Sequence, residues 1–117
     1  MPKADHLQEV MEENYHYNLS LPDFAKLCNR SLSSFKRDFY AVYKTNPGHW
    51  LLSKKLDHSH HLLTTTDKTV NEISVESGFE NSTHFSKAFK KRFGLSPLHY
   101  RHHSAISHIS PDTVLNS

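Results

Sequence analysis

The stretch "GFENSTHFSKAFKKRFGLSPLHYR", Gly78 to Arg101, repeats the pattern of an earlier stretch, "NRSLSSFKRDFYAVYKTNPGHW", Asn29 to Trp50. A shift of 50 residues aligns aromatic with aromatic, cation with cation and proline with proline. The aligned pairs are Phe35 and Phe85, Arg37 and Lys87, Phe39 and Phe89, Tyr43 and Phe93, Pro47 and Pro97, His49 and His99, and Trp50 and Tyr100. The chain therefore contains the same amphipathic pattern twice.

Length and composition restrict the class of protein. A chain of 117 residues forms one compact domain, or two very small ones that share a core. Three glycines argue against a turn-rich β design, and no apolar run approaches the ~20 residues that span a bilayer. The single cysteine, Cys28, forms no internal disulfide, so we expect a protein of the reducing cytoplasm.

Charge is distributed unevenly although the net charge is only +2. Residues 31–103 hold eleven Lys or Arg against six Asp or Glu, whereas residues 1–30 are acidic on balance. The positive excess lies with the two repeats, as expected of a surface that binds a polyanion.

A short helix is predicted before each basic segment. "SLPDFAKLC" begins with Ser20 and Asp23, and "TVNEISVES" begins with Thr69 and Glu72. Both pairs have the spacing of a capping box, in which each side chain accepts from a backbone N–H of the other residue. The expected inward residues of the first short helix are Phe24, Ala25 and Leu27.

A turn and a second, capped helix follow each short helix. Gly78 is suited to a left-handed turn, and Asn29 takes the same place in the first repeat, where the turn is one residue shorter. Ser31 and Asn81 are equivalent N-cap residues. This order of elements is the helix-turn-helix pattern, and it occurs twice.

The remaining segments complete an all-α fold of about seven helices. We expect an amphipathic helix over residues 2–17, a long connector helix over 47–63, and a final helix that begins at Pro97. The predicted domain spans residues 5–103, with units at 5–46 and 69–103 on either side of the connector, and residues 104–117 are expected to form a disordered tail.

Helical geometry identifies the outward residues of the two basic helices. With the paired phenylalanines inward, polar and cationic side chains occupy the remaining arc, and such side chains hydrogen-bond base edges and phosphates in the major groove of DNA. These candidate DNA-binding residues are Ser33, Ser34, Lys36, Arg37 and Tyr40 in the first helix, and Ser82, Thr83, His84, Ser86, Lys87, Lys90 and Lys91 in the second.

With these residues and their spacing, the sequence resembles the DNA-binding domain of the AraC/XylS family of bacterial transcription regulators. The motifs that carry the resemblance are "GF", "FKK", "SP" and the closing "YR" of residues 73–101, with "SLPDFAKL" and "FKRDF" in the first half. The resemblance implies an activator that inserts two recognition helices into adjacent major grooves. The base-contacting positions that it implies are Ser33, Lys36, Arg37, Ser82, Thr83, Ser86 and Lys87.

The resemblance also implies partners and a larger context. The expected partners are double-stranded DNA and RNA polymerase, with no membrane and no cofactor. Members commonly carry a sensing or dimerisation domain, so we expect this chain to be the C-terminal fragment of a longer regulator.

Several residues depart from the family pattern, among them Lys55 and Ser59, which replace the usual Arg and Ala of the connector. Lys44 stands where a glycine usually ends the first recognition helix, so a strained or an altered C-cap is expected. Ser74 replaces an alanine and requires a carbonyl partner for its hydroxyl. Asp38 lies next to Arg37 and either orients that side chain or repels phosphate.

Other classes of function have weaker support in the sequence. Eleven histidines suggest metal binding, with His58 and His61 on one helix face and His102 beside His103, but no ligand spacing is recognisable. Cys28 has no neighbouring base for nucleophilic catalysis, so we expect no enzyme. A protein-binding helical bundle remains an alternative, and its partner affinity would be insensitive to salt.

Overall fold

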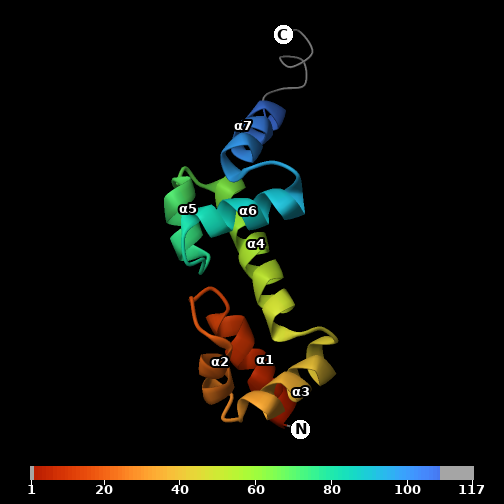
Figure 1. Ribbon diagram of the computed structural model, residues 1–117. Coiled ribbons are helices and arrows are strands. Elements are labelled where there is room, and N and C mark those ends of the chain that lie inside the picture. Colours follow the sequence, from red (N-terminus) through yellow and green to blue (C-terminus); the bar gives the residue numbers. More distant parts are fainter. Residues whose placement is uncertain (1, 109–117) are drawn as a thin grey trace. The chain divides into compact units, whose positions relative to one another are not determined.

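The computed structural model describes residues 2–108, with side chains for residues 6–103. Over this range the chain is all-α, as predicted, and has seven helices (Figure 1). They are α1 (Pro2–Asn14), α2 (Leu21–Leu27), α3 (Leu32–Tyr43), α4 (Pro47–Thr65), α5 (Val70–Glu76), α6 (Ser82–Phe93) and α7 (Pro97–His108).

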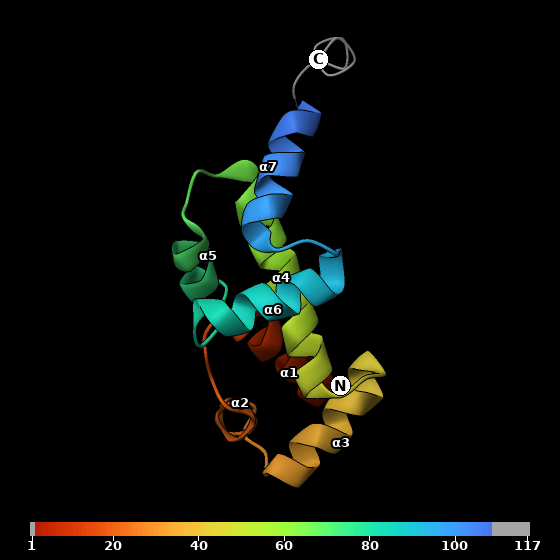
Figure 2. The same ribbon diagram turned by 45° about the horizontal axis from the view of Figure 1, so that its top comes forward.

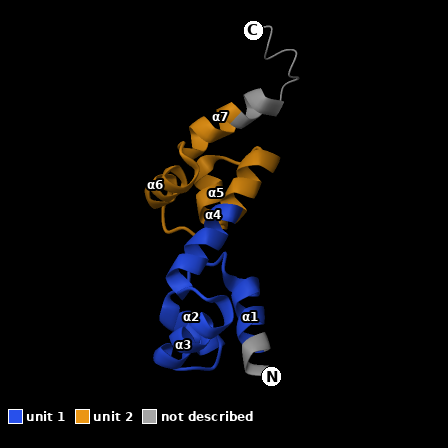
Figure 3. Ribbon diagram, turned by 90° about the vertical axis from the view of Figure 1, so that its right-hand side faces the viewer, with its two compact units in different colours: residues 1–57 blue, residues 58–117 orange. Residues whose placement is uncertain are grey.

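The chain divides into two compact units, residues 1–57 and 58–117. The boundary falls inside α4, which is one continuous helix in Figures 1 and 2. Figure 3 shows the change of unit partway along this helix. α4 covers the connector helix predicted at 47–63 and continues to Thr65, with its first part in unit 1 and its second part in unit 2.

The core of unit 1 is an apolar cluster contributed by α1, α2, α3 and the start of α4. Phe24, Phe35 and Phe39 are fully buried in it, with Tyr43 and Trp50 packed at its edge. The other buried members are Leu7, Val10, Met11, Ala25, Cys28 and Leu51. Truncating a buried phenylalanine to alanine costs about 3–5 kcal/mol in such a core, so these side chains fix the position of α3.

Four aromatic rings pack in series in each unit, and we call each series an aromatic ladder. In unit 1 the ladder is Phe35, Phe39, Tyr43 and Trp50, with ring centroids 5.8 Å apart for the first pair and 4.5 Å for the second. In unit 2 the equivalent rings are Phe85, Phe89, Phe93 and Tyr100, and the same two distances are 5.7 and 4.5 Å. Centroids of the second and fourth rings are 5.6 Å apart in unit 1 and 5.5 Å in unit 2. The 50-residue sequence repeat is thus a repeat of packing.

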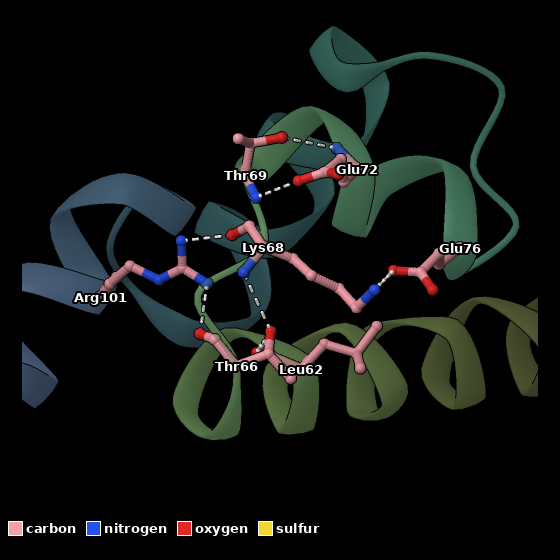
Figure 4. A network of polar contacts seen from close by, with 7 residues as sticks. All are labelled: Leu62, Thr66, Lys68, Thr69, Glu72, Glu76 and Arg101. Carbon is pink, nitrogen blue, oxygen red and sulfur yellow. Dashed lines mark hydrogen bonds and ion pairs between the residues drawn. The ribbon is translucent and has the colours of Figure 1, made fainter.

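Arg101, the last residue of the sequence motif, connects α7 to the end of α4. Its Nε donates to the carbonyl of Leu63 at 3.2 Å, and its Nη2 donates to that of Thr66 at 3.1 Å. Nη1 donates to the carbonyl of Lys68, and Figure 4 shows the bonds from Arg101 to Thr66 and Lys68. Leu63 lies in the last turn of α4, where carbonyls have no intrahelical donor, and Thr66 and Lys68 lie in the segment after it, so the guanidinium satisfies the end of the helix and holds the segment that follows.

Both capping boxes are present. Ser20 Oγ accepts from the N–H of Asp23 at 3.2 Å, and Asp23 Oδ2 accepts from the N–H of Ser20 at 3.1 Å. In α5, Thr69 Oγ1 accepts from the N–H of Glu72 at 3.1 Å, and Glu72 Oε1 accepts from the N–H of Thr69 at 2.8 Å. The predicted starts of both short helices are confirmed.

Two expectations differ from the structure. Leu27 is 46% exposed, because Cys28 rather than Leu27 fills the inward position at the end of α2. A tail was expected from residue 104, but α7 continues to His108. The first residue after Pro97 that cannot continue a helix is Pro111, so the sequence contains no stop at residue 104. Residues 109–117 lie outside the described part.

Candidate nucleic-acid interface

The turns before α3 and α6 share one backbone motif. Asn29 has a φ of 61° and Gly78 a φ of 91°, both left-handed, as the sequence predicts. In the first turn, the N–H groups of Asn29 and Arg30 donate to the carbonyls of Lys26 and Ala25 at 2.9 Å. The second turn makes the same two bonds one repeat later, from Gly78 to Val75 and from Phe79 to Ser74, at 3.0 Å. This pair of bonds is a Schellman motif, which ends one helix sharply and redirects the chain into the next.

Each basic helix begins at a side-chain cap. Ser31 Oγ accepts from the N–H of Ser34 at 3.2 Å, and Asn81 Oδ1 accepts from the N–H of His84 at 2.8 Å. Each cap satisfies one amide, and the first two amides of each helix have no intrahelical acceptor. Such a helix N-terminus attracts phosphate through its free N–H groups and its dipole.

The outward face of α3 is polar and contains both predicted cations. Ser33, Lys36, Arg37 and Tyr40 are exposed, with the Arg37 side chain 74% exposed and Tyr40 60% exposed. Ser34 is half-buried. The structure places these five predicted residues on the side of α3 away from Phe35 and Phe39, where a ligand can reach them.

The outward face of α6 is more strongly basic. Thr83, His84, Lys87, Lys90 and Lys91 are exposed. Ser82 and Ser86 are half-buried. Four cations and no carboxylate occur within α6, whereas α3 has two cations and one carboxylate.

His84 is held beside the turn as well as exposed. Its ring makes an edge-on contact with the buried Phe79 ring, with centroids 5.6 Å apart. This candidate DNA-binding residue therefore also packs against the turn.

An ion-pair network at the first turn was not foreseen from the sequence. Asp38 Oδ2 accepts from Arg30 Nε at 2.8 Å, and Asp38 Oδ1 accepts from Arg37 Nε at 3.4 Å. Arg30 also donates through Nη1 to the carbonyl of Cys28 at 3.0 Å, and its side chain is only 9% exposed. The hydrogen bond from Arg30 holds the pKa of the Asp38 carboxyl below its ordinary value. Only the turn geometry brings Arg30 to Asp38, so the spacing in sequence carries no signal for the pair.

Two open hollows flank the α3 face. One, of about 470 Å³, is lined by residues 28–31 of the turn, by Ser34, Arg37 and Asp38 of α3, and by His6 of α1. The other, of about 280 Å³, is lined by Lys36 and Tyr40 together with Leu21 and residues 46–48. The hollows separate the predicted residues of α3 into two groups, Ser34 with Arg37 and Lys36 with Tyr40.

The other sites considered from the sequence have no supporting geometry in the described part of the chain. No three His, Cys, Asp or Glu side chains within it are placed to hold a metal ion. Burial raises the pKa of the Cys28 thiol, which opposes formation of a nucleophilic thiolate. No helix within the same range is long and apolar enough to cross a membrane.

Two helix-turn-helix units, each with an exposed basic second helix, define the class of helix-turn-helix DNA-binding domains. A family model described as a helix-turn-helix domain matches residues 24–103. The chain belongs to the AraC/XylS family of transcription regulators, of which this is the DNA-binding domain.

Curated relatives and solved structures agree with this assignment. The chain is 31% identical over 98 residues to the HTH-type transcriptional regulator ExsA of Pseudomonas aeruginosa, covering 84% of this chain and 35% of ExsA. It is 32% identical over 97 residues to the virulence regulon transcriptional activator VirF of Yersinia enterocolitica, covering 83% of this chain and 36% of VirF. The chain therefore spans about a third of the length of these relatives.

Two solved structures are similar over nearly the whole chain. The DNA-binding domain of the global transcriptional factor AdpA, in complex with a target DNA, has a TM-score of 0.83 and 25% identity, over 90% of this chain and 97% of that one. A transcriptional regulator with an AraC-type DNA-binding domain from Chromobacterium violaceum has a TM-score of 0.73 and 27% identity, over 94% of this chain and 95% of that one.

Proposed function

We propose that this chain recognises specific sequences in double-stranded DNA by placing α3 and α6 in successive segments of the major groove. One observation carries the proposal: two capped helices present cations at the same register, Arg37 and Lys87, over equivalent aromatic ladders. Repetition of a core explains folding, but it does not require a repeated cation on the exposed face. The AdpA domain, which has the same fold, was solved with its target DNA, and this supports the proposal.

The proposed contacts divide into base readers and backbone contacts. The base readers are Ser33, Lys36, Arg37, Ser82, Thr83, Ser86 and Lys87, whose short hydroxyls and cations match acceptors on base edges. The proposed backbone contacts are Ser34, Tyr40, His84, Lys90 and Lys91, at the edges of the same faces. Because the two sets of readers differ, the recognised site is asymmetric rather than palindromic.

The regulatory role extends the DNA-binding function. We assign DNA binding to residues 5–103, and we propose that the regulator activates transcription in the bacterial cytoplasm with RNA polymerase as a protein partner. The name of VirF as an activator supports the sign of regulation. The chain covers about a third of the length of its curated relatives. We therefore assign sensing of an effector, or dimerisation, to a domain outside these residues.

The test is selection of a random duplex library on the purified chain at moderate salt, with sequencing of the bound pool. We expect a bipartite motif whose two halves differ and whose centres lie about one helical turn, ~34 Å, apart. Arg37→Ala should relax one base pair in one half, and Lys87→Ala should relax a pair in the other half, each at a cost of about 1–3 kcal/mol at its own position.

Other outcomes would contradict specific parts of the proposal. A selected motif with only one half would mean that one of the two units reads no bases and serves only as a scaffold. An unenriched pool would mean that the isolated chain binds without specificity. Partner binding that is insensitive to salt, with no affinity for DNA, would favour the helical interaction bundle instead.

A further inference from the structure

Asp38 divides its carboxylate between a buried arginine and an exposed one. Oδ2 accepts from Arg30 Nε at 2.8 Å, and Oδ1 accepts from Arg37 Nε at 3.4 Å. The Arg30 side chain is 9% exposed and is fixed a second time by the Cys28 carbonyl, at 3.0 Å. Asp38 is therefore fixed to the turn on one side and faces an exposed cation on the other.

The Arg30 bond prevents Asp38 from simply cancelling the charge of Arg37. Two cations share one carboxylate, so the group of three residues keeps a net positive charge. The contact with Arg37 is long and lies at an exposed site, so it adds little to stability. Its effect is on direction, because the Nε edge of the Arg37 guanidinium faces Asp38.

A guanidinium whose Nε faces a carboxylate has its two terminal amino groups left to donate outward. These two groups match the O6 and N7 acceptors of guanine, the commonest specific contact in the major groove. A planar donor pair held in one orientation loses less conformational freedom on binding than an unrestrained side chain.

Unit 2 has no equivalent arrangement in the described residues. The shift of 50 places Lys87 at the position of Arg37 and Ala88 at that of Asp38. The turn before α6 is one residue longer, and the buried Phe79 follows its left-handed residue where Arg30 does in the first turn. The ammonium group of lysine is a point charge without a planar donor pair. Unit 2 therefore presents a positive charge at this position, whereas unit 1 presents an oriented guanidinium.

We propose that Asp38 is a positioning residue that, held by Arg30, orients Arg37 toward a guanine and makes unit 1 the more selective of the two readers. This inference rests on the proposed DNA binding and names the residue that sharpens it. It also chooses between the two roles that the sequence left open for Asp38, orientation of Arg37 and repulsion of phosphate.

The test compares Asp38→Asn with the unmodified chain on the selected duplex and on duplexes that replace the guanine. Asparagine keeps one oxygen for Arg30 but turns an amino group toward Arg37. We expect discrimination at that base pair to fall about two- to fivefold, in line with the strength of an exposed ion pair, while affinity for random DNA stays equal or rises because a negative charge is lost. Equal losses on specific and random DNA, with a lower melting temperature, would mean a structural role only and would overturn the inference.

A double-mutant cycle with Arg37→Ala separates positioning from direct reading. If Asp38 acts through Arg37, Asp38→Asn has no further effect on discrimination once Arg37 is alanine. A further loss in that background would assign base reading to Asp38 itself, for example to cytosine N4, and would overturn the positioning role. An unmodified chain that selects no motif would instead contradict the proposed function, so the two failures are distinguishable.

A spectroscopic measurement needs no folded variant. In the free, unmodified chain, the Hε proton of Arg37 should exchange with water more slowly than that of a guanidinium without an acceptor. Exchange at the rate of a free guanidinium would show that Asp38 does not hold Arg37. The result would then contradict the inference even if every Asp38 variant failed to fold.

Discussion

Three buried hydroxyls, those of Tyr43, Ser74 and Ser77, have no hydrogen-bond partner among the described residues. A buried hydroxyl without a partner costs about 1–3 kcal/mol of desolvation. The repeat identifies an apolar alternative for each one. Aligned with the other unit, Tyr43 corresponds to Phe93, Ser74 to Ala25 and Ser77 to Cys28.

Ser74→Ala should stabilise the protein. The sequence sets a condition for this serine, that its hydroxyl finds a carbonyl, and the structure does not meet that condition. We expect the free energy of unfolding in urea to rise by about 1 kcal/mol, because the variant no longer buries an unpaired hydroxyl. The matched control is Ala25→Ser at the equivalent position of unit 1, which should lower it. A decrease for Ser74→Ala would show that the hydroxyl has a partner after all.

Tyr43→Phe should stabilise the protein most at alkaline pH. Burial, reinforced by Glu12 and Cys28, raises the pKa of Tyr43 from 10 to about 12. Between those values the unfolded chain loses the phenolic proton and the folded chain keeps it, so stability falls as pH rises from about 10 to 12.

Urea unfolding at neutral pH and at pH near 11 measures both parts of this effect. The variant should be more stable by about 1 kcal/mol at neutral pH, and it should lose less stability than the unmodified chain on the alkaline side. Tyr17→Phe, at an exposed position, is the control and should change neither quantity. The same alkaline loss in Tyr43→Phe as in the unmodified chain would assign that loss to other groups.

At this scale the sequence predicted best where one side chain acts on its own backbone. The caps at Ser20, Ser31 and Thr69 depend on residues three positions apart, so local spacing is enough to find them. Arg30 and Asp38 meet only after the chain has turned, and no local pattern predicts their contact. The outward position of the candidate DNA-binding residues followed from helical periodicity, but their contacts with DNA remain a prediction.

The helices differ in how they end. Lys44 closes α3 in a left-handed conformation with a φ of 60°, whereas Gly94 closes α6 with a φ of 88°. Of the two outcomes that the sequence leaves open at Lys44, a strained or an altered cap, the left-handed φ shows the strained one, since a residue with a Cβ costs about 1 kcal/mol or more in this region.

Lys44→Gly should raise the free energy of unfolding by about 0.5–1 kcal/mol, because relief of strain exceeds the entropy that glycine gains in the unfolded chain. Gly94→Ala should lower it by about 1 kcal/mol. A Cβ at Gly94 would meet nothing within 4 Å, so any loss there comes from the backbone and not from a clash. Chemical denaturation of both variants checks the pair, and a destabilised Lys44→Gly would refute the strain.

Whole elements were largely predictable because their boundaries carry explicit signals. Capping boxes, prolines at helix starts and a left-handed Asn or Gly mark most of the ends. A tail was expected from residue 104, where the sequence has no helix-stop signal, and α7 continues to His108. The contacts of Arg101 with three carbonyls some 35 residues away depend on tertiary packing, which periodicity does not encode.

For the molecule as a whole, we expect the cations of α6 to set the salt dependence of DNA binding. Each phosphate contact contributes about 0.9 to the slope of log affinity against log salt on duplex DNA. Lys91→Ala should therefore weaken specific and random DNA alike and flatten the slope by about one unit, as measured by titration at several salt concentrations. Arg37→Ala is the contrasting variant, with a loss confined largely to the specific duplex. An unchanged slope in Lys91→Ala would remove this lysine from the backbone contacts.

The overall architecture was predictable because the sequence contains the helix-turn-helix pattern twice. A single amphipathic helix with basic residues is uninformative, but two copies at a fixed spacing indicate two copies of one function. The two units differ in features that only the structure shows, such as the Arg30 network and the unpaired hydroxyl of Ser74.

The similarity of the two aromatic ladders has a consequence for folding errors, although the centroids of the third and fourth rings are 4.8 Å apart in unit 1 and 5.9 Å apart in unit 2. The unfolded chain contains two similar sets of aromatic side chains. Each basic helix could therefore pack against the short helix of the other unit instead of the short helix of its own unit. Misassembly between similar units is a known failure of repeat proteins. Three features differ between the two units and disfavour such non-native pairing. They are the turn lengths, the Arg30 network in unit 1 and the Arg101 contacts in unit 2. We therefore expect variants that make the copies more alike to refold through a slower, trapped population even where they gain equilibrium stability.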